Sequence, residues 1–217
     1  MSYGEPIALR GQMDLEQVAS AALVDECSAE VKFVERLKNG EGAAFDILVR
    51  ERSGEIYGLL YRLTQNAEEA RDLTQETFLR AFQSIASFRG DADLRTWIYR
   101  IAINQARNRW RWWRRRKRDS TVSLDASDGR AQPLFASLRA SRSSNPELAT
   151  LAHERENALS KALNALGRSY RETVILRDVE GFSYDEIAAT LGISVGTVKS
   201  RLARGRHELR RRLEGSL

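Results

Sequence analysis

The residues at 183–209, SYDEIAATLGISVGTVKSRLARGRHEL, have the types and spacing of a DNA-binding helix-turn-helix. Ile187 and Leu191 form the inner face of a first helix, and Gly192 permits the sharp turn after it. Val198 and Leu202 then form the inner face of a second helix. Basic and polar side chains remain for the outer surface and its flanks: Thr197, Lys199, Ser200, Arg201, Arg204 and Arg206. Such a helix fits a major groove, where lysine and arginine reach base edges and phosphates. An ordinary helical hairpin with a basic solvent face is the alternative, and the agreement of turn, capping and charge favours DNA binding.

A second group of residues has the chemistry of single-strand binding. Residues 107–118, RNRWRWWRRRKR, contain eight bases and no acid, with three tryptophans among them. Aromatic rings that stack on unpaired bases, with arginines on the backbone, are typical of such surfaces, and asparagine can read a base edge. The candidates for this role are Phe88, Trp97, Arg100, Asn104, Arg107 and Asn108, with Tyr99 among the neighbouring aromatics. For Phe88 and Trp97 a place in the hydrophobic core is the alternative.

A third group is a polar strip on one predicted helix. Asp72, Gln75 and Glu76 lie opposite the apolar face that Leu73 and Phe78 define. Carboxylates in this arrangement can pair with a basic surface on a partner protein. Taken alone, the strip is better explained as a solvated helix face.

The elements that position these groups are all predicted to be helical. Residues 68–88 are amphipathic, residues 89–93 form a turn, and a second helix runs from about Leu94 to Trp113. Helix starts are predicted by Asn145-Pro146, by the capping boxes at 169–172 and 183–186, and by Ser194. No strand pattern appears, so we expect an all-α protein.

A change in composition divides the chain. Residues 118–146 are rich in serine, aspartate, arginine and alanine, and are too long for a tight loop within one compact domain. We therefore expect two small helical domains joined by a flexible linker, the C-terminal one a helix-turn-helix. The predicted divisions are a variable extension at 1–30, a domain at 31–113, a linker at 114–146 and a domain at 147–217.

Composition excludes several classes of protein. The 217 residues carry a net charge of +5. They contain no apolar run long enough to span a bilayer and no secretory signal, so we expect a cytoplasmic protein without membrane insertion. The single Cys27 cannot form an internal disulfide, and no Cys/His cluster predicts a metal or other cofactor. Because His153 and His207 are isolated and no glycine-rich phosphate loop is present, we expect no catalytic site and no enzyme activity.

Three segments together resemble a bacterial RNA polymerase sigma factor of the extracytoplasmic-function (ECF) group. These are DLTQETFLRAF, FRGDADLRTWIYRIAINQARN and LRDVEGFSYDEIAATLGISVGTVKSRLARGR. The resemblance covers about residues 31–113 and 147–213, which it identifies as sigma regions 2 and 4. It implies that the protein binds the polymerase core and directs it to promoters. The extension at 1–30 and the basic, tryptophan-rich run at 109–118 depart from the family pattern.

The resemblance also implies roles for the three groups. Asp72, Gln75 and Glu76 match the surface that grips the clamp helices of the largest polymerase subunit. Residues 88–104 match the elements that capture a flipped base of the −10 element. The helix from Ser194 matches the reader of the −35 duplex, and Tyr184 and Asp185 start the preceding helix, whose positive end can meet a phosphate. An anti-sigma factor is the implied regulator.

Two other functions remain as alternatives. The first is a classical helix-turn-helix regulator, in which residues 31–113 would sense a ligand or dimerise without polymerase. The second is an enzyme acting on nucleic acid, for which Asp91 and Asp93 are the nearest metal-binding carboxylates, although a turn explains them better. No ligand-pocket pattern supports the first, so the sigma-factor hypothesis is favoured.

Overall fold

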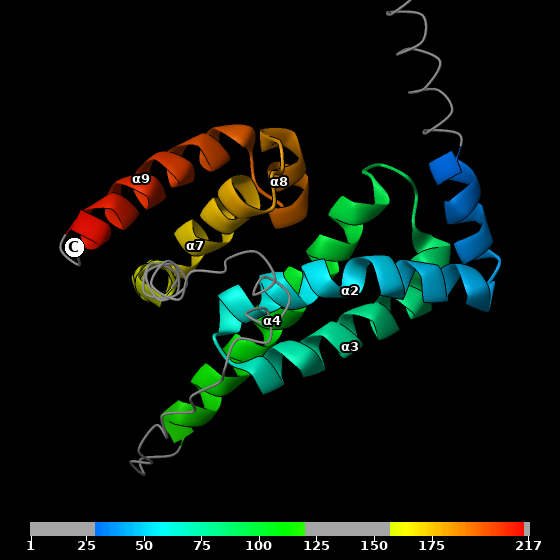
Figure 1. The fold of residues 1–217 in the computed structure, drawn as a ribbon, viewed down its shortest axis with the longest axis horizontal. Helices are drawn as coiled ribbons and strands as arrows, with labels where there is room; N and C mark the ends of the chain where they lie inside the picture. The colour runs from blue at the N-terminus through cyan, green and yellow to red at the C-terminus, as the bar shows by residue number, and fades with distance from the viewer. Residues whose placement is uncertain (1–28, 120–156, 215–217) are drawn as a thin grey trace, which may run out of the picture.

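The structure, a computed structural model, describes residues 29–119 and 157–214 (Figure 1). Within these ranges all regular structure is helical, which confirms the predicted fold class. The helices cover residues 29–38, α2 (Gly42–Thr64), α3 (Ala67–Ser84), a short 3₁₀ turn (Ile85–Ser87), α4 (Leu94–Asp119), residues 157–165, α7 (Arg168–Val174), a π-helical segment (Ile175–Val179), α8 (Tyr184–Leu191) and α9 (Val195–Glu214). Residues 1–28, Cys27 among them, the predicted helix start at Asn145-Pro146, and most of the predicted linker lie outside the described residues.

The N-terminal half is built from α2, α3 and α4, which pack against one another. α2 ends where Gln65 adopts a left-handed conformation and donates its N–H to the carbonyl of Tyr61 at 2.8 Å. Asn66 then caps α3 by accepting a hydrogen bond from the N–H of Glu69 at 3.0 Å. Glu68, exposed in the first turn of α3, carries a negative charge at the positive end of the helix dipole, which is a favourable position. These local signals set the tight turn that makes α2 and α3 neighbours.

The predicted turn at 89–93 is present and positions the start of α4. Gly90 has a φ of +79°, and Asp93 accepts a hydrogen bond from the N–H of Thr96. α4 then runs to Asp119 without a break, beyond the predicted end at Trp113. Its last turns therefore include residues that the sequence pattern assigned to the linker.

The C-terminal half begins differently from the prediction. α7 starts at Arg168 after Gly167, with no side-chain cap, so the capping box predicted at Ser169 and Glu172 is wrong. The carboxylate of Glu172 is bound by Arg107 and Arg168 instead of by a backbone N–H. By contrast, the capping box at 183–186 is confirmed.

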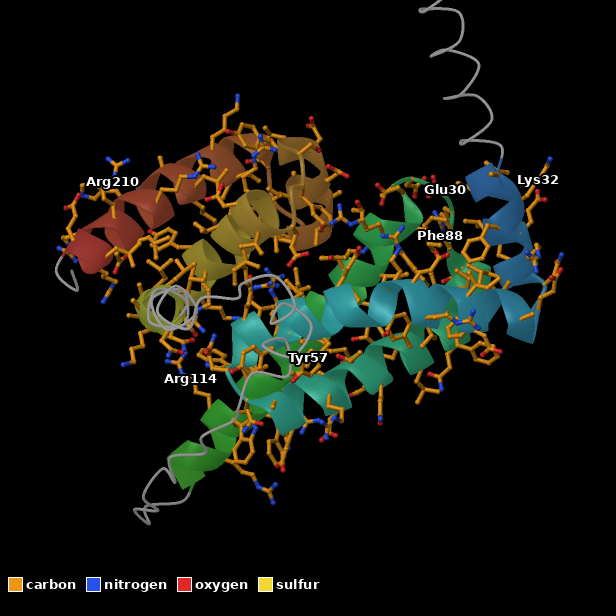
Figure 2. The ribbon with its side chains drawn as sticks, viewed as in Figure 1. Glu30, Lys32, Tyr57, Phe88, Arg114 and Arg210 are labelled. Carbon is orange, nitrogen blue, oxygen red and sulfur yellow. The ribbon has the colours of Figure 1, made fainter. Side chains whose placement is uncertain are left out.

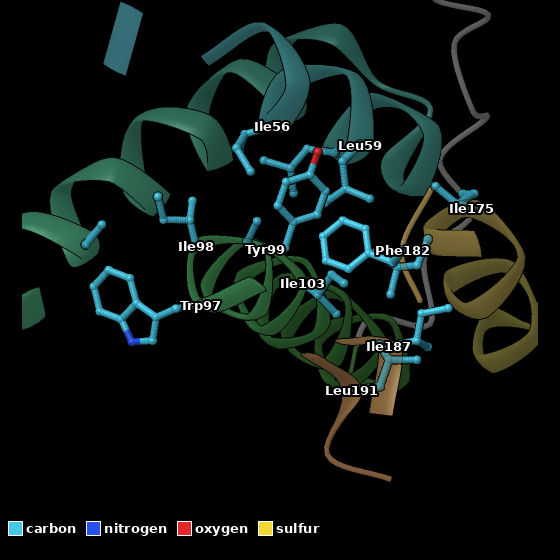
Figure 3. Close-up of a cluster of buried hydrophobic side chains, with 14 of the residues drawn as sticks. Ile56, Leu59, Trp97, Ile98, Tyr99, Ile103, Ile175, Phe182, Ile187 and Leu191 are labelled. Carbon is cyan, nitrogen blue, oxygen red and sulfur yellow. The ribbon is translucent and has the colours of Figure 1, made fainter. Parts of the chain in front are cut away.

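The two halves lie against each other, with α8 packed on α4. Their buried apolar side chains form one cluster that continues from Ile56 and Ile103 to Ile175 and Leu191 (Figure 3). At its centre the rings of Tyr99 and Phe182 are 4.8 Å apart, one from each half. The sequence predicted two domains but not this direct contact between them.

Candidate nucleic-acid interface

The helix-turn-helix is fixed by short-range hydrogen bonds. Ser183 and Glu186 cap α8 reciprocally: the Ser183 hydroxyl accepts from the Glu186 N–H at 3.2 Å, and the Glu186 carboxylate accepts from the Ser183 N–H at 2.6 Å. α8 ends at Gly192, whose φ of +67° disfavours any residue with a Cβ. The Ser194 hydroxyl then accepts from the N–H of Thr197 at 3.3 Å and begins α9. Turn and caps are as the sequence predicts.

Packing beneath α9 orients its outer face. Val198 and Leu202 are buried, and Gly205 lies so close to α7 that a Cβ there would come within 2.8 Å of a Val174 methyl carbon. This close approach fixes the rotation of α9 about its axis. Lys199, Ser200 and Arg204 are consequently exposed, while Arg201 and Thr197 are half-buried.

The flanking residues of the motif differ in availability. Arg206 is bound to the carboxylate of Asp178 by two hydrogen bonds, of which that from Nε is 3.0 Å, and this bonding raises the pKa of the Arg206 guanidinium. Tyr184 is half-buried, with the guanidinium of Arg177 5.0 Å from its ring centre. Asp185 is exposed at the start of α8. The predicted residues thus lie on α8 and on α9 from Thr197 to Arg206, and Arg206 among them is engaged within the protein.

The predicted acidic strip lies on the outer face of α3. Asp72 and Gln75 are exposed, and Glu76 is half-buried beside Arg80, with 3.3 Å between their nitrogen and oxygen atoms. Leu73 on the opposite face is buried. The strip is accessible to a macromolecular partner in this conformation.

The predicted aromatic pair is part of the core. Phe88 and Trp97 are only 7% and 8% exposed, and their ring centres are 5.3 Å apart. Neither ring is open to a base in this conformation, so the core alternative describes them here. By contrast, Arg100, Asn104 and Asn108 are exposed and four residues apart, which places them on one face of α4.

Arg107 is turned toward the C-terminal half. Its guanidinium contacts the carboxylate of Glu172 at 2.6 and 3.2 Å, and Arg168 contacts the same carboxylate at 2.8 Å. The Glu172 side chain is only 4% exposed. The structure therefore separates Arg107 from the exposed stripe and places it in the contact between the halves.

A second buried carboxylate in this contact was missed by sequence reasoning. Glu180 accepts a hydrogen bond from the Tyr99 hydroxyl at 2.7 Å and one from Arg62 at 3.1 Å. Arg95 donates to the backbone carbonyl of Glu180 at 2.8 Å. Burial, together with the Glu180 charge, raises the pKa of Tyr99, so its hydroxyl stays protonated and donates. Tyr99, counted among the candidate aromatics for unpaired bases, is instead buried between the halves, and no local pattern marks its partner 81 residues away.

The described part of the chain holds no group of three or more His, Cys, Asp or Glu side chains that could bind a metal ion. None of the described helices combines the length and apolarity that crossing a bilayer requires.

Comparison with known proteins gives concordant matches for both halves. Residues 48–118 match the family "Sigma-70 region 2", and residues 156–209 match "Sigma-70, region 4". The chain is 36% identical over 184 residues to the RNA polymerase sigma-H factor of Pseudomonas aeruginosa, covering 84% of this chain and 93% of the relative. It is 34% identical over 177 residues to the ECF RNA polymerase sigma-E factor of Escherichia coli, covering 81% and 90%.

Two solved structures are similar across most of the chain. One is CnrH in complex with the cytosolic domain of CnrY, with a TM-score of 0.62 and 24% identity over 87% of this chain and 99% of that one. The other is the sigma factor RpoE from Bartonella quintana with the anti-sigma factor NepR, with a TM-score of 0.59 and 26% identity over 78% and 96%.

Proposed function

The chain belongs to the ECF group of RNA polymerase sigma factors, and from this premise we propose how its residues divide the work of promoter recognition. As a sigma factor, it joins the polymerase core and directs initiation at promoters. We assign residues 31–113 to region 2, residues 147–217 to region 4, residues 114–146 to the linker and residues 1–30 to a variable extension. That α4 continues to Asp119 adds its last turns to region 2.

Region 4 reads the −35 duplex through α9. Lys199 and Arg204 are exposed on its outer face, and among the described residues no ion pair engages them or Arg201. In a major groove their cationic groups bind guanine edges or phosphates, while Thr197 and Ser200 add hydrogen bonds. Tyr184, Asp185 and Arg206 flank this surface, and Arg206 contacts DNA only if it leaves Asp178.

Region 2 binds the polymerase core through Asp72, Gln75 and Glu76. These side chains form an accessible acidic strip on a rigid helix whose opposite face is buried. Such a strip suits a basic surface on the polymerase clamp. The partial engagement of Glu76 by Arg80 is a weak surface pair that a stronger partner displaces.

Region 2 also reads the −10 element. Arg100, Asn104 and Asn108 form an exposed stripe along α4, suited to phosphates and to the edges of unpaired bases. Phe88 and Trp97 are packed in the core at the start of α4. Arg107 joins the exposed stripe when its ion pair with Glu172 breaks. Flipping a base costs a few kcal/mol of lost stacking, which these contacts offset.

Three further assignments complete the proposal. The chain acts without catalysis of its own and without a cofactor, because positioning the polymerase is its whole task. It acts in the cytoplasm, where the polymerase is. The similar Bartonella quintana factor is bound to an anti-sigma factor, which supports a regulator of that kind for this chain.

One combined observation carries the proposal. The chain matches sigma region 2 and then sigma region 4, and these parts contain an accessible strip on α3 and an intact helix-turn-helix. The test is core-polymerase binding and run-off transcription on a genomic fragment library. We expect the wild type to form a holoenzyme that initiates at discrete sites, and the variant Asp72→Ala/Gln75→Ala/Glu76→Ala to lose core binding.

A matched control removes the same kinds of side chain elsewhere. Glu35, Glu51 and Gln83 are exposed, and their triple alanine variant should bind core as the wild type does. If the wild type ignores core and binds particular duplexes alone, the classical regulator is the correct description.

A further inference from the structure

The last turns of α4 have a composition that the proposed function does not use. Residues 108–116, which we call the tryptophan–arginine segment, belong to the last turns of α4, whose end extends past α2 and α3 (Figure 1). The segment begins beside α3, where Glu76 lines a cleft with Trp112 and Arg115. Trp110, Trp112 and Trp113 are 41 to 49% exposed, which is unusual for so large an apolar side chain. Three such rings on a basic helix indicate a surface with a partner.

This segment continues the proposed −10 surface along the same helix face. Arg100, Asn104, Asn108, Arg111 and Arg115 are spaced by three or four residues, and all five are exposed. The stripe extends over about 22 Å at a helical rise of about 1.5 Å per residue. That length matches about six base pairs, since successive base pairs are about 3.4 Å apart.

The charge of the segment fits a polyanion. No acid occurs between residues 107 and 118. Arg111 donates to the side chain of Asn108, and among the described residues no ion pair neutralises Arg114 or Arg115. Arg114 stands at the surface of the molecule (Figure 2). An open cleft of about 630 Å³ is lined by Asn108, Trp110, Arg111, Arg114 and Arg115.

The tryptophans hold arginines in place. Arg114 lies over the ring of Trp110 at 5.2 Å, and Arg116 lies over Trp112 at 4.4 Å. A guanidinium that stacks on a ring contacts it through its flat face. Its in-plane N–H groups then remain available to donate to phosphate oxygens. Stacking also restricts the arginine rotamers before binding, so less conformational entropy is lost in the complex. Both pairs lie within α4 and persist if the two halves separate, whereas Arg168, 5.0 Å from Trp110, belongs to the other half.

The same contacts disfavour unpaired bases as the partner. A base would have to replace a guanidinium to stack on the covered side of Trp110 or Trp112, whereas a phosphate leaves these pairs intact. The arginines of this segment are therefore suited to bind a sugar–phosphate backbone. Since the chain passes from the end of α4 to the half that reads the −35 element, the adjacent DNA is the duplex between the two elements.

We propose that the tryptophan–arginine segment binds the phosphate backbone of the spacer duplex next to the −10 element, and so adds sequence-independent affinity to the promoter complex. This inference rests on the proposed function. It assigns Arg111, Arg114 and Arg115 to phosphates, and Trp110 and Trp112 to the positioning of arginines.

The test measures holoenzyme binding to two templates made from a promoter recovered by run-off transcription. One carries an unpaired −10 region with the spacer duplex attached, and the other is cut at the spacer-side edge of the −10 element. On the long template we expect Arg111→Ala/Arg114→Ala/Arg115→Ala to lower the slope of log K against log salt by about 2.7, for three contacts. Between about 50 and 200 mM salt, the wild type then loses about 40-fold more affinity than the variant. On the short template the two proteins should have equal slopes.

Controls separate this contact from net charge and from folding. Lys32→Ala/Arg50→Ala/Lys161→Ala removes the same charge from exposed positions and should keep the wild-type slope. Trp110→Leu/Trp112→Leu keeps the arginines and should weaken long-template binding several-fold while leaving the salt slope nearly unchanged. Helicity by circular dichroism should be unchanged in the arginine variant, because alanine is the strongest helix former.

Three results would overturn the inference: a triple-arginine variant that matches the charge control, an equal loss of slope on both templates, or a tryptophan variant that loses single-stranded binding alone. The last two would place the contact on unpaired DNA. Core binding is measured in the same samples, so a failure of the sigma-factor function itself appears as a loss of holoenzyme in the wild type.

Discussion

Removing the Tyr99 hydroxyl should loosen the contact between the two halves without damaging either. Tyr99→Phe keeps the ring that packs 4.8 Å from Phe182 and deletes only the donor to Glu180. Tyr99 is 1% exposed and the Glu180 side chain 8%, so water does not replace the bond while the halves stay closed. The substitution therefore tests one hydrogen bond across the contact surface between the two halves, which we call the seam.

The expected magnitude follows from the partners. A hydrogen bond to a charged group contributes about 1.5–3 kcal/mol, so the closed-to-open equilibrium constant should fall about 10- to 150-fold. Arg62, with 39% of its side chain exposed, should contribute less than about 1 kcal/mol to the same carboxylate. In a double-mutant cycle with Glu180→Ala, which removes the acceptor, the coupling energy should be about 1.5–3 kcal/mol.

The assay is single-molecule energy transfer between dyes at the exposed residues Gln83 and Ala203, in a Cys27→Ser background. The populations of high and low transfer give the closed fraction for each variant of the cycle. Tyr61→Phe, within the N-terminal half, serves as the control and should leave the closed fraction unchanged. A coupling energy below about 0.5 kcal/mol would refute the reasoning, because the hydroxyl would then be no better bonded in the seam than in water.

Two further predictions concern the stability of the halves themselves. Gly205→Ala should destabilise the C-terminal half by about 1–2 kcal/mol in urea denaturation, because overpacking against Val174 outweighs the gain in helix propensity. The control is Gly54→Ala, which has open space around it and should stabilise α2 by about 0.5–1 kcal/mol. Burial raises the pKa of Glu69, so its contribution to stability is complete below its ordinary pKa and is lost as pH rises through the raised value. Glu69→Gln should therefore be more stable than the wild type at neutral pH, and a denaturation series from pH 4 to 8 that shows no such gain would contradict the assignment.

Features set by neighbours in sequence could be predicted from the sequence. The reciprocal bonds of Ser183 and Glu186, the left-handed Gly192 and the cap at Ser194 all join residues at most five apart, and all are present. The same local logic failed at Ser169 and Glu172. There the pattern for a capping box exists, but Arg107, 65 residues away, binds the carboxylate more strongly than a backbone N–H would.

Features set by the packing of distant helices could not be predicted. Trp97 has the same hydrophobic spacing whether it faces a core or a cleft, and its burial against Phe88 and the rest of the core depends on packing that this spacing does not specify. No sequence pattern links Tyr99 to Glu180, because 81 residues separate them, including the entire segment between the two halves. The exposure of the candidate residues on α9 and α3 could be predicted, because an exposed face follows from the buried one opposite; their role in binding stays a prediction.

The seam between the halves sets a requirement on every partner that needs them apart. Arg107 cannot bind a phosphate while its guanidinium is held by buried Glu172. To convert a chain that is 99% closed into one that is 99% open, a partner must bind the open form about 10⁴-fold more tightly, equivalent to about 5.5 kcal/mol. Asp72 and Gln75 are exposed in the closed form, so the polymerase core can bind them before the seam opens. Under the proposed assignments, burial therefore permits one order of steps: the core can engage α3 in the closed form, whereas −10 contacts of Arg107 require prior release of the carboxylate of Glu172.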